Sequence, residues 1–171
     1  MSALGGAPVY GDATLTLHVQ HNLLVATWYA APTVAQMRCI GEQFLKLSRS
    51  FGNDVGFANL IIRARVEQST KEAREEALLL LKRFRENRCF AHVVFETGLT
   101  GALVKTVLRT IGMAGPNRGS VRVFGSTLDA AGWIASKLTG HADRAWSSSE
   151  VLTLLNFAGK TPLDGALVSP R

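Results

Sequence analysis

The sequence predicts an α/β domain in which helices cover a mixed five-stranded sheet. Two apolar runs with strand character, 14–19 and 23–29, come first, and helix-like and strand-like stretches then alternate to about residue 139. Such alternation is typical of β-α-β units, whose right-handed crossovers join parallel strands. The predicted order is β-β-α-β-α-β-α-β-α, with antiparallel pairing only in the opening hairpin.

The opening hairpin follows from side-chain alternation. Residues 14–19 alternate polar and apolar side chains, as expected of a strand with one buried face. Gln20, His21 and Asn22 make a short turn, and 23–29 returns with many β-forming residues. Pro32 and Thr33 then open the first helix, which runs to about Ser50.

The first helix leads into a fully buried strand. Gly41 falls inside the apolar stripe of that helix, where a missing side chain lets the helix approach the sheet closely. Residues 55–62 form a nearly unbroken apolar run, which is typical of a strand covered on both faces. Strands are also predicted at 89–95 and 121–124.

Three more helices alternate with these strands. The second begins at a capping box formed by residues 69–72 and ends near Glu86. The third covers about 100–113, and the fourth is capped by Thr127 and ends near Gly140. Periodicity places these side chains on the buried side of the third helix: Leu103, Val104, Val107, Leu108 and Ile111.

A change of character at residue 140 divides the chain into a domain, 1–140, and an appendage, 141–171. Ser147 and Glu150 cap a short helix over 151–155, and the residues after 159 have no clear period. The appendage covers a surface, engages a partner or packs onto its own domain. The sequence leaves these alternatives open.

The composition predicts a globular protein without membrane-spanning helices. The chain has 171 residues, of which 47% are hydrophobic and 19% charged, an ordinary globular balance. No window is apolar enough for a transmembrane helix, and the N-terminus lacks a secretory signal. Cys39 and Cys89 fit no C-x-x-C pattern, so reduced thiols and a cytoplasmic location are expected.

The order of elements over about 14–140 resembles the STAS fold of anti-sigma-factor antagonists and the related SEC14-like domains. The resemblance rests on topology and segment lengths. It implies a module that binds partner proteins, and some such domains bind small or lipid-like ligands. The antagonists carry a phosphorylated serine after their third strand, where Ser69 and Thr70 stand here, but the Asp and Gly of their motif are absent.

Ser69 and Thr70 therefore have two interpretations. As helix caps they would stabilise the second helix by about 1 kcal/mol, and the capping box already explains them. As phosphosites they would place new negative charge at a helix N-terminus, where it is electrostatically favourable.

A basic surface is the second candidate site. No acidic residue occurs from Thr97 to Leu128, and the net charge of the chain is +6. Lys105 and Arg109 lie opposite the predicted buried side of the third helix, and Leu79 lies on the solvent side of the second. The candidate partner or anion-binding surface consists of Arg65, Leu79, Lys105, Arg109, Arg118 and Arg122. An ordinary solvated face is the alternative.

These observations favour a non-enzymatic regulatory or scaffold module that acts through a protein partner or as a homodimer. Nucleic acid is not favoured, because aromatic residues are not interleaved with the basic ones. No cofactor, metal site or catalytic residue is predicted, and His92 is expected to be a hydrogen-bonded core residue. The alternative function is small-molecule or lipid binding, which a deep apolar pocket under the first two helices would support.

Overall fold

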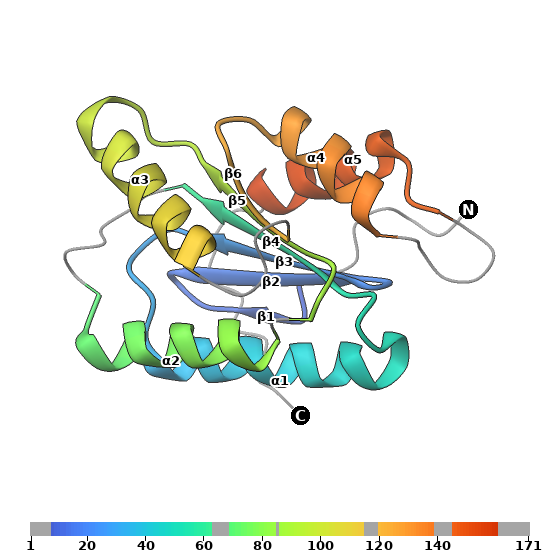
Figure 1. The fold of residues 1–171 in the computed structure, drawn as a ribbon, viewed down its shortest axis with the longest axis horizontal. Coiled ribbons are helices and arrows are strands. Elements are labelled where there is room, and N and C mark those ends of the chain that lie inside the picture. The colour runs from blue at the N-terminus through green and yellow to red at the C-terminus, as the bar shows by residue number, and fades with distance from the viewer. Residues whose placement is uncertain (1–7, 63–68, 85, 115–119, 139–144, 161–171) are drawn as a thin grey trace.

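The computed structural model describes residues 8–62, 69–84, 86–114, 120–138 and 145–160, and for residues 110–114 it describes the backbone alone. These residues have an α/β fold (Figure 1). The described strands are β1 (Tyr10–Gly11), β2 (Leu15–Gln20), β3 (Leu23–Trp28), β4 (Gly56–Ile61), β5 (Cys89–Val94) and β6 (Val121–Phe124). The described helices are α1 (Val34–Phe51), α2 (Lys71–Arg83), α3 (Gly98–Ala114), α4 (Thr127–Lys137) and α5 (Ser148–Lys160).

The strands form one six-stranded mixed sheet in sequence order, β1-β2-β3-β4-β5-β6. The predicted hairpin is confirmed, because β2 and β3 pair antiparallel from Leu15 opposite Trp28 to Gln20 opposite Leu23. The three later pairs, β3–β4, β4–β5 and β5–β6, are parallel, as the crossovers predicted.

The prediction of five strands was wrong by one, because β1 adds a sixth. It has two residues, with Tyr10 opposite Leu17 and Gly11 opposite Thr16. In the turn that follows β1, Asp12 Oδ1 accepts hydrogen bonds from the backbone N–H groups of Thr14 and Leu15 at 2.7 and 2.8 Å. Two residues are too few to show any periodicity, so the pattern could not reveal this strand.

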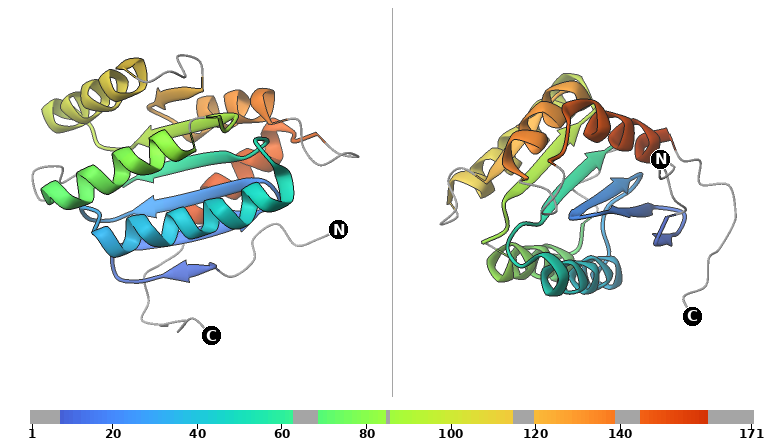
Figure 2. Two further views of the ribbon diagram at one scale, coloured as in Figure 1. Left: turned by 60° about the horizontal axis from the view of Figure 1, so that its bottom comes forward. Right: turned by 90° about the vertical axis from the view of Figure 1, so that its right-hand side faces the viewer.

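The sheet lies between two layers of helices (Figure 1). On one face, α1 and α2 pack on Leu24, Phe57 and Phe90, and on the other, α4 and α5 pack on Val25 and Leu60. The views in Figure 2 show α1 and α2 side by side on the first face. The third helix, α3, lies beside β6 and packs through Val104 and Leu108 on Val94.

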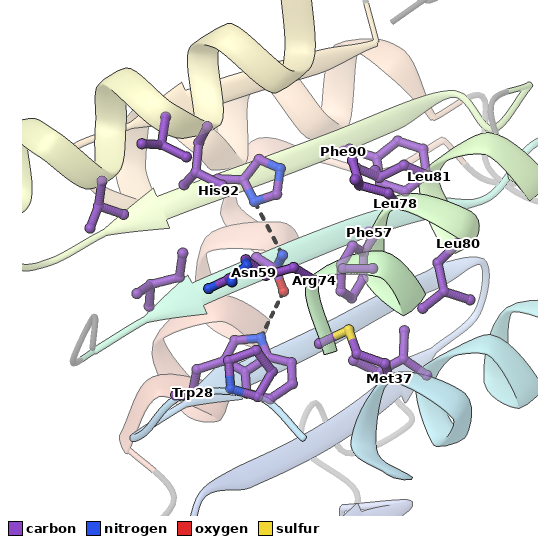
Figure 3. Close-up of a pocket in the computed structure, with 18 of the residues that line it drawn as sticks. Trp28, Met37, Phe57, Asn59, Arg74, Leu78, Leu80, Leu81, Phe90 and His92 are labelled. Carbon is purple, nitrogen blue, oxygen red and sulfur yellow. Dashed lines mark hydrogen bonds between the residues drawn. The ribbon is translucent and has the colours of Figure 1, made fainter. Parts of the chain in front are cut away.

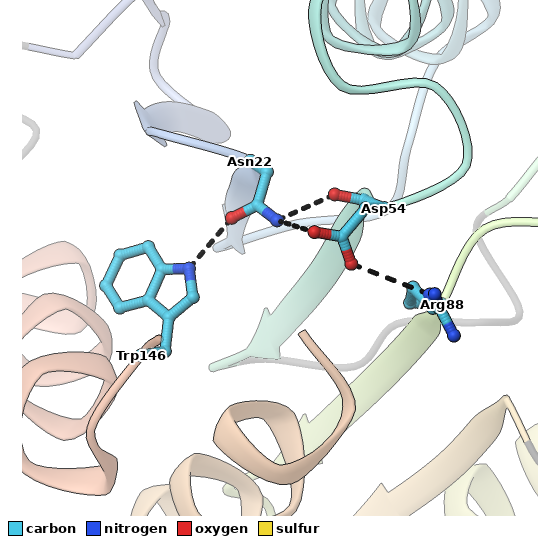
Figure 4. A network of polar contacts seen from close by, with 4 residues as sticks. All are labelled: Asn22, Asp54, Arg88 and Trp146. Carbon is cyan, nitrogen blue, oxygen red and sulfur yellow. Dashed lines mark hydrogen bonds and ion pairs between the residues drawn. The ribbon is translucent and has the colours of Figure 1, made fainter. Parts of the chain in front are cut away.

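The helix α5 packs on its own sheet beside α4. Leu155 is fully buried, and the Thr27 hydroxyl on β3 donates to the carbonyl oxygen of Ala158 at 3.3 Å. At the start of α5, the Trp146 indole N–H donates to Asn22 Oδ1 at 2.8 Å, and Asn22 Nδ2 donates to the backbone oxygen of Asp54 at 2.7 Å (Figure 4). Of the alternatives for the appendage, packing onto the domain is the one adopted by these residues.

Two helix N-caps differ from the predicted ones by one residue, and one agrees with the prediction. The capping box of α1 between Thr33 and Gln36 is present, and Thr33 is the N-cap as predicted. In α2, however, Thr70 and not Ser69 is the N-cap, so no Glu stands at the position that a capping box requires. In α4 the N-cap is Ser126 and not Thr127.

Two packing predictions were also wrong. A Cβ at Gly41 would lie 2.8 Å from Leu80 Cδ2, so this glycine lets α1 approach α2 and not the sheet. On α3, Leu103 and Val107 were predicted to be buried, but they are 64% and 38% exposed, and Leu99 is 92% exposed. Because α3 covers only the edge of the sheet, Val104 and Leu108 are sufficient to pack it there.

None of the helices within the described residues is both long enough and apolar enough to span a membrane.

Candidate apolar binding cavity

A cavity of about 370 Å³ lies between the sheet and the helices α1, α2 and α3. This volume is within the range of small-molecule sites in proteins. The apolar part of its wall includes Met37, Phe44, Phe57, Leu78, Leu81, Phe90 and Val107.

An aromatic cluster forms part of the cavity wall. Phe44 on α1 stacks on Phe84 with ring centroids 4.8 Å apart, and meets Phe57 and Phe90 at 5.1 and 5.8 Å. Small side chains at Ala30, Ala31 and Ala77 also line the cavity. The wall therefore combines large aromatic and small aliphatic side chains.

A row of polar side chains crosses the sheet at this cavity (Figure 3). The Trp28 indole N–H donates to Asn59 Oδ1 at 2.9 Å, and Asn59 Nδ2 lies 3.1 Å from His92 Nδ1. Asn59 and His92 are paired across β4 and β5, which puts their side chains on the same face. The three residues come from three adjacent strands.

His92 is neutral at physiological pH. Its side chain is 7% exposed, and burial lowers its pKa from 6.5 to about 4. Its hydrogen-bond partner is an amide and not a carboxylate, so nothing in this row stabilises an imidazolium. The prediction that His92 is a hydrogen-bonded core residue is confirmed.

Arg74 lines the same cavity from the first turns of α2. Its Nη1 donates to the backbone oxygen of Ser69 at 2.7 Å, and its side chain extends from α2 toward Asn59 (Figure 3). It forms no ion pair with any residue in the described part of the chain. A cation is thus available at the cavity.

The predicted phosphosite residues differ in accessibility. Ser69 is 8% exposed, whereas Thr70 is exposed and accepts the backbone N–H of Ala73 at 3.1 Å. The helix-cap interpretation therefore describes what Thr70 does in this structure.

The predicted partner surface is spread over separate elements. Leu79 is 58% exposed on α2, as its position on the helix predicted, and Arg109 is exposed on α3. Lys105 is half-buried, and Arg122 on β6 lies over the Trp133 ring at 5.7 Å. Arg65 and Arg118 lie outside the described residues.

The sequence reading missed Trp28, Asn59 and Arg74 as site residues. Asn59 and His92 each interrupt an otherwise apolar buried strand at the same position from its start, and this was the available signal. Arg74 gave none, because it is exposed, as a charged residue near the start of a helix usually is, and only the structure shows that it also lines the cavity.

The described residues contain no group of three or more His, Cys, Asp or Glu side chains placed to hold a metal ion. Burial raises the pKa of Cys89 to about 12 and also raises that of Cys39, so both thiols are protonated at neutral pH.

Comparison of the chain with family models, with curated proteins and with solved structures found no match.

Proposed function

We propose that the protein is a non-enzymatic module that binds a small, mainly apolar molecule in the cavity between α1, α2, α3 and the sheet. The observation that carries this proposal is a cavity of about 370 Å³ whose wall, among the described residues, is apolar except for Trp28, Asn59, Arg74 and His92. A mostly apolar enclosure with a few convergent polar groups is typical of ligand sites. The resemblance to domains that include binders of lipid-like ligands agrees with the proposal.

Filling the cavity tests this function. The probe is N-phenyl-1-naphthylamine, a neutral apolar fluorophore whose emission rises on leaving water. Ala77→Phe puts a ring at a position that lines the cavity, and Ala102→Phe makes the same change at an exposed position of α3 outside it. Ala31→Trp is a second filling variant at another lining position.

The unmodified protein and Ala102→Phe are expected to bind the fluorophore saturably at one site, and the filling variants to lose this binding. Circular dichroism checks that each variant is folded. The proposal is wrong if the unmodified protein does not bind the fluorophore, or if both folded filling variants bind it as the unmodified protein does.

Protein contact is a second candidate function, favoured by the exposed face of α3. Leu99 and Leu103 are one turn apart and are 92% and 64% exposed. We propose that this face joins two copies of the chain. Sedimentation should then show a dimer that Leu99→Asp combined with Leu103→Asp dissociates, while Leu79→Asp on α2 leaves it intact. A chain that stays monomeric at high concentration contradicts this second function.

A further inference from the structure

The hydrogen bonds in the row formed by Trp28, Asn59 and His92 determine which atom donates and which accepts in each pair. An indole N–H can only donate, so the Asn59 atom 2.9 Å from Trp28 Nε1 is the carbonyl oxygen Oδ1. The amide nitrogen of Asn59 then faces His92 Nδ1 at 3.1 Å and donates to it. Nδ1 is therefore an acceptor, and the single proton of the neutral imidazole is on Nε2.

The Nε2–H group of His92 is a donor without a partner in the described part of the chain. Among the described residues this ring hydrogen-bonds to Asn59, and the side chain lines the cavity. A donor at the cavity wall that lacks a partner among these residues is free to bind a ligand atom that accepts.

Arg74 is also a pure donor, with five N–H groups, of which the Ser69 carbonyl uses one. It is the one cationic side chain among the described residues that line the cavity, and no acidic side chain lines it with them. Within the described residues, His92 and Arg74 thus offer donors that no other side chain there uses, together with one unit of positive charge.

We propose that the ligand is an amphipathic carboxylate, whose apolar body packs against the aromatic wall and whose carboxylate accepts from the Arg74 guanidinium and from His92 Nε2–H. This proposal rests on the proposed binding function. A carboxylate matches the donors of Arg74 and His92 and the one positive charge among the described lining residues, and its planar shape suits a guanidinium. A phosphate monoester brings more negative charge than this one arginine balances. An ammonium group would meet the like charge of Arg74.

Three probes that share a ten-carbon chain and differ in the head group test the inference: decanoate, methyl decanoate and decylammonium. Each displaces N-phenyl-1-naphthylamine from the full-length protein, at concentrations below micelle formation. Arg74→Gln removes the charge, and Arg109→Gln makes the same substitution at an exposed position of α3 outside the cavity. Arg74→Lys keeps the charge without the guanidinium shape.

Decanoate is expected to bind more tightly than the other two probes. Arg74→Gln should weaken the binding of decanoate by about 10- to 100-fold, the usual range for losing a hydrogen bond to a charged group. The same variant should leave methyl decanoate nearly unchanged, Arg74→Lys should recover part of the loss, and Arg109→Gln should change neither probe.

The outcomes separate this inference from the proposed function. If the fluorophore binds in the cavity but methyl decanoate binds the unmodified protein as tightly as decanoate, the carboxylate assignment is wrong and the binding function stands. The assignment is equally wrong if Arg74→Gln weakens both probes to the same extent. If neither the fluorophore nor any probe binds, the proposed function itself fails.

Discussion

Asn59 donates its side-chain amide N–H to Nδ1 of His92, and the two residues are directly paired on adjacent parallel strands. The bond requires an unprotonated Nδ1, so the folded protein favours the neutral imidazole. Burial acts in the same direction and lowers the pKa of His92 to about 4. The pair therefore couples folding to pH.

Acidification should destabilise the protein through His92. The folded pKa of about 4 lies below the ordinary value of 6.5, so the unfolded chain takes up the proton first. The stability due to neutral His92 is complete above about pH 6.5 and is lost as the pH falls toward about 4. Relative to His92→Gln, which does not titrate, the free energy of unfolding should fall by up to about 3 kcal/mol. Urea unfolding at several pH values measures this, and parallel curves for the two proteins contradict it.

Loss of the central ring of the aromatic cluster should strongly destabilise the fold. Phe44 is 1% exposed and contacts three other phenylalanine rings. Phe44→Ala should lower the free energy of unfolding by about 3 to 5 kcal/mol, because burial is lost and a void remains. Leu79→Ala, at a 58% exposed position, should change it by less than about 0.5 kcal/mol. Chemical denaturation compares the two variants, and equal effects would be inconsistent with this core.

The close approach of α1 and α2 at Gly41 should make substitutions there depend on Leu80. A Cβ at position 41 would lie 2.8 Å from Leu80 Cδ2. Gly41→Ala gains about 1 kcal/mol of helix propensity but crowds this methyl group. In a Leu80→Ala background the crowding is gone, so Gly41→Ala should be more favourable there by about 1 kcal/mol or more. A double-mutant cycle measures the coupling, and additivity would show that the helices do not touch at this point.

The bond between Trp146 and Asn22 should help hold α5 on the sheet (Figure 4). Asn22 is fully buried, so removing the indole donor leaves its oxygen without that partner. Trp146→Phe should lower the free energy of unfolding by about 1 to 3 kcal/mol. Much of this loss should disappear in an Asn22→Ala background, where no carbonyl is left to satisfy. An unchanged loss in that background would assign the effect to ring packing.

The central strands and their order could be predicted because their patterns are unambiguous. The runs at β3, β4 and β5 are apolar and bounded by turn residues, which leaves little choice but buried strands. The exposed side of α3 could not be predicted in the same way. Leu99, Leu103 and Val107 form one apolar stripe and Val104 and Leu108 another, so the position of α3 at the sheet edge decides which is buried.

The cavity could not be predicted from any local pattern. Its volume depends on where α1, α2 and α3 lie over the sheet, which contacts between distant parts of the chain decide, such as the close approach of α1 to α2 at Gly41 and Leu80. From the sequence, an apolar pocket under the first two helices could be named only as the feature that would support ligand binding. The donor row also needed the register that places Asn59 opposite His92.

The contact between Thr27 and Ala158 joins residues 131 positions apart, so one side of the sheet is completed only after α5 has been made. While the ribosome is still making α5, the apolar side chains of Val25 and Leu60 lack part of their final cover. Segments nearer in the chain, α1 and α2, close the opposite side much sooner. A nascent chain that has not yet reached α5 would expose part of this face, and exposed apolar surface of this kind makes folding intermediates prone to aggregation.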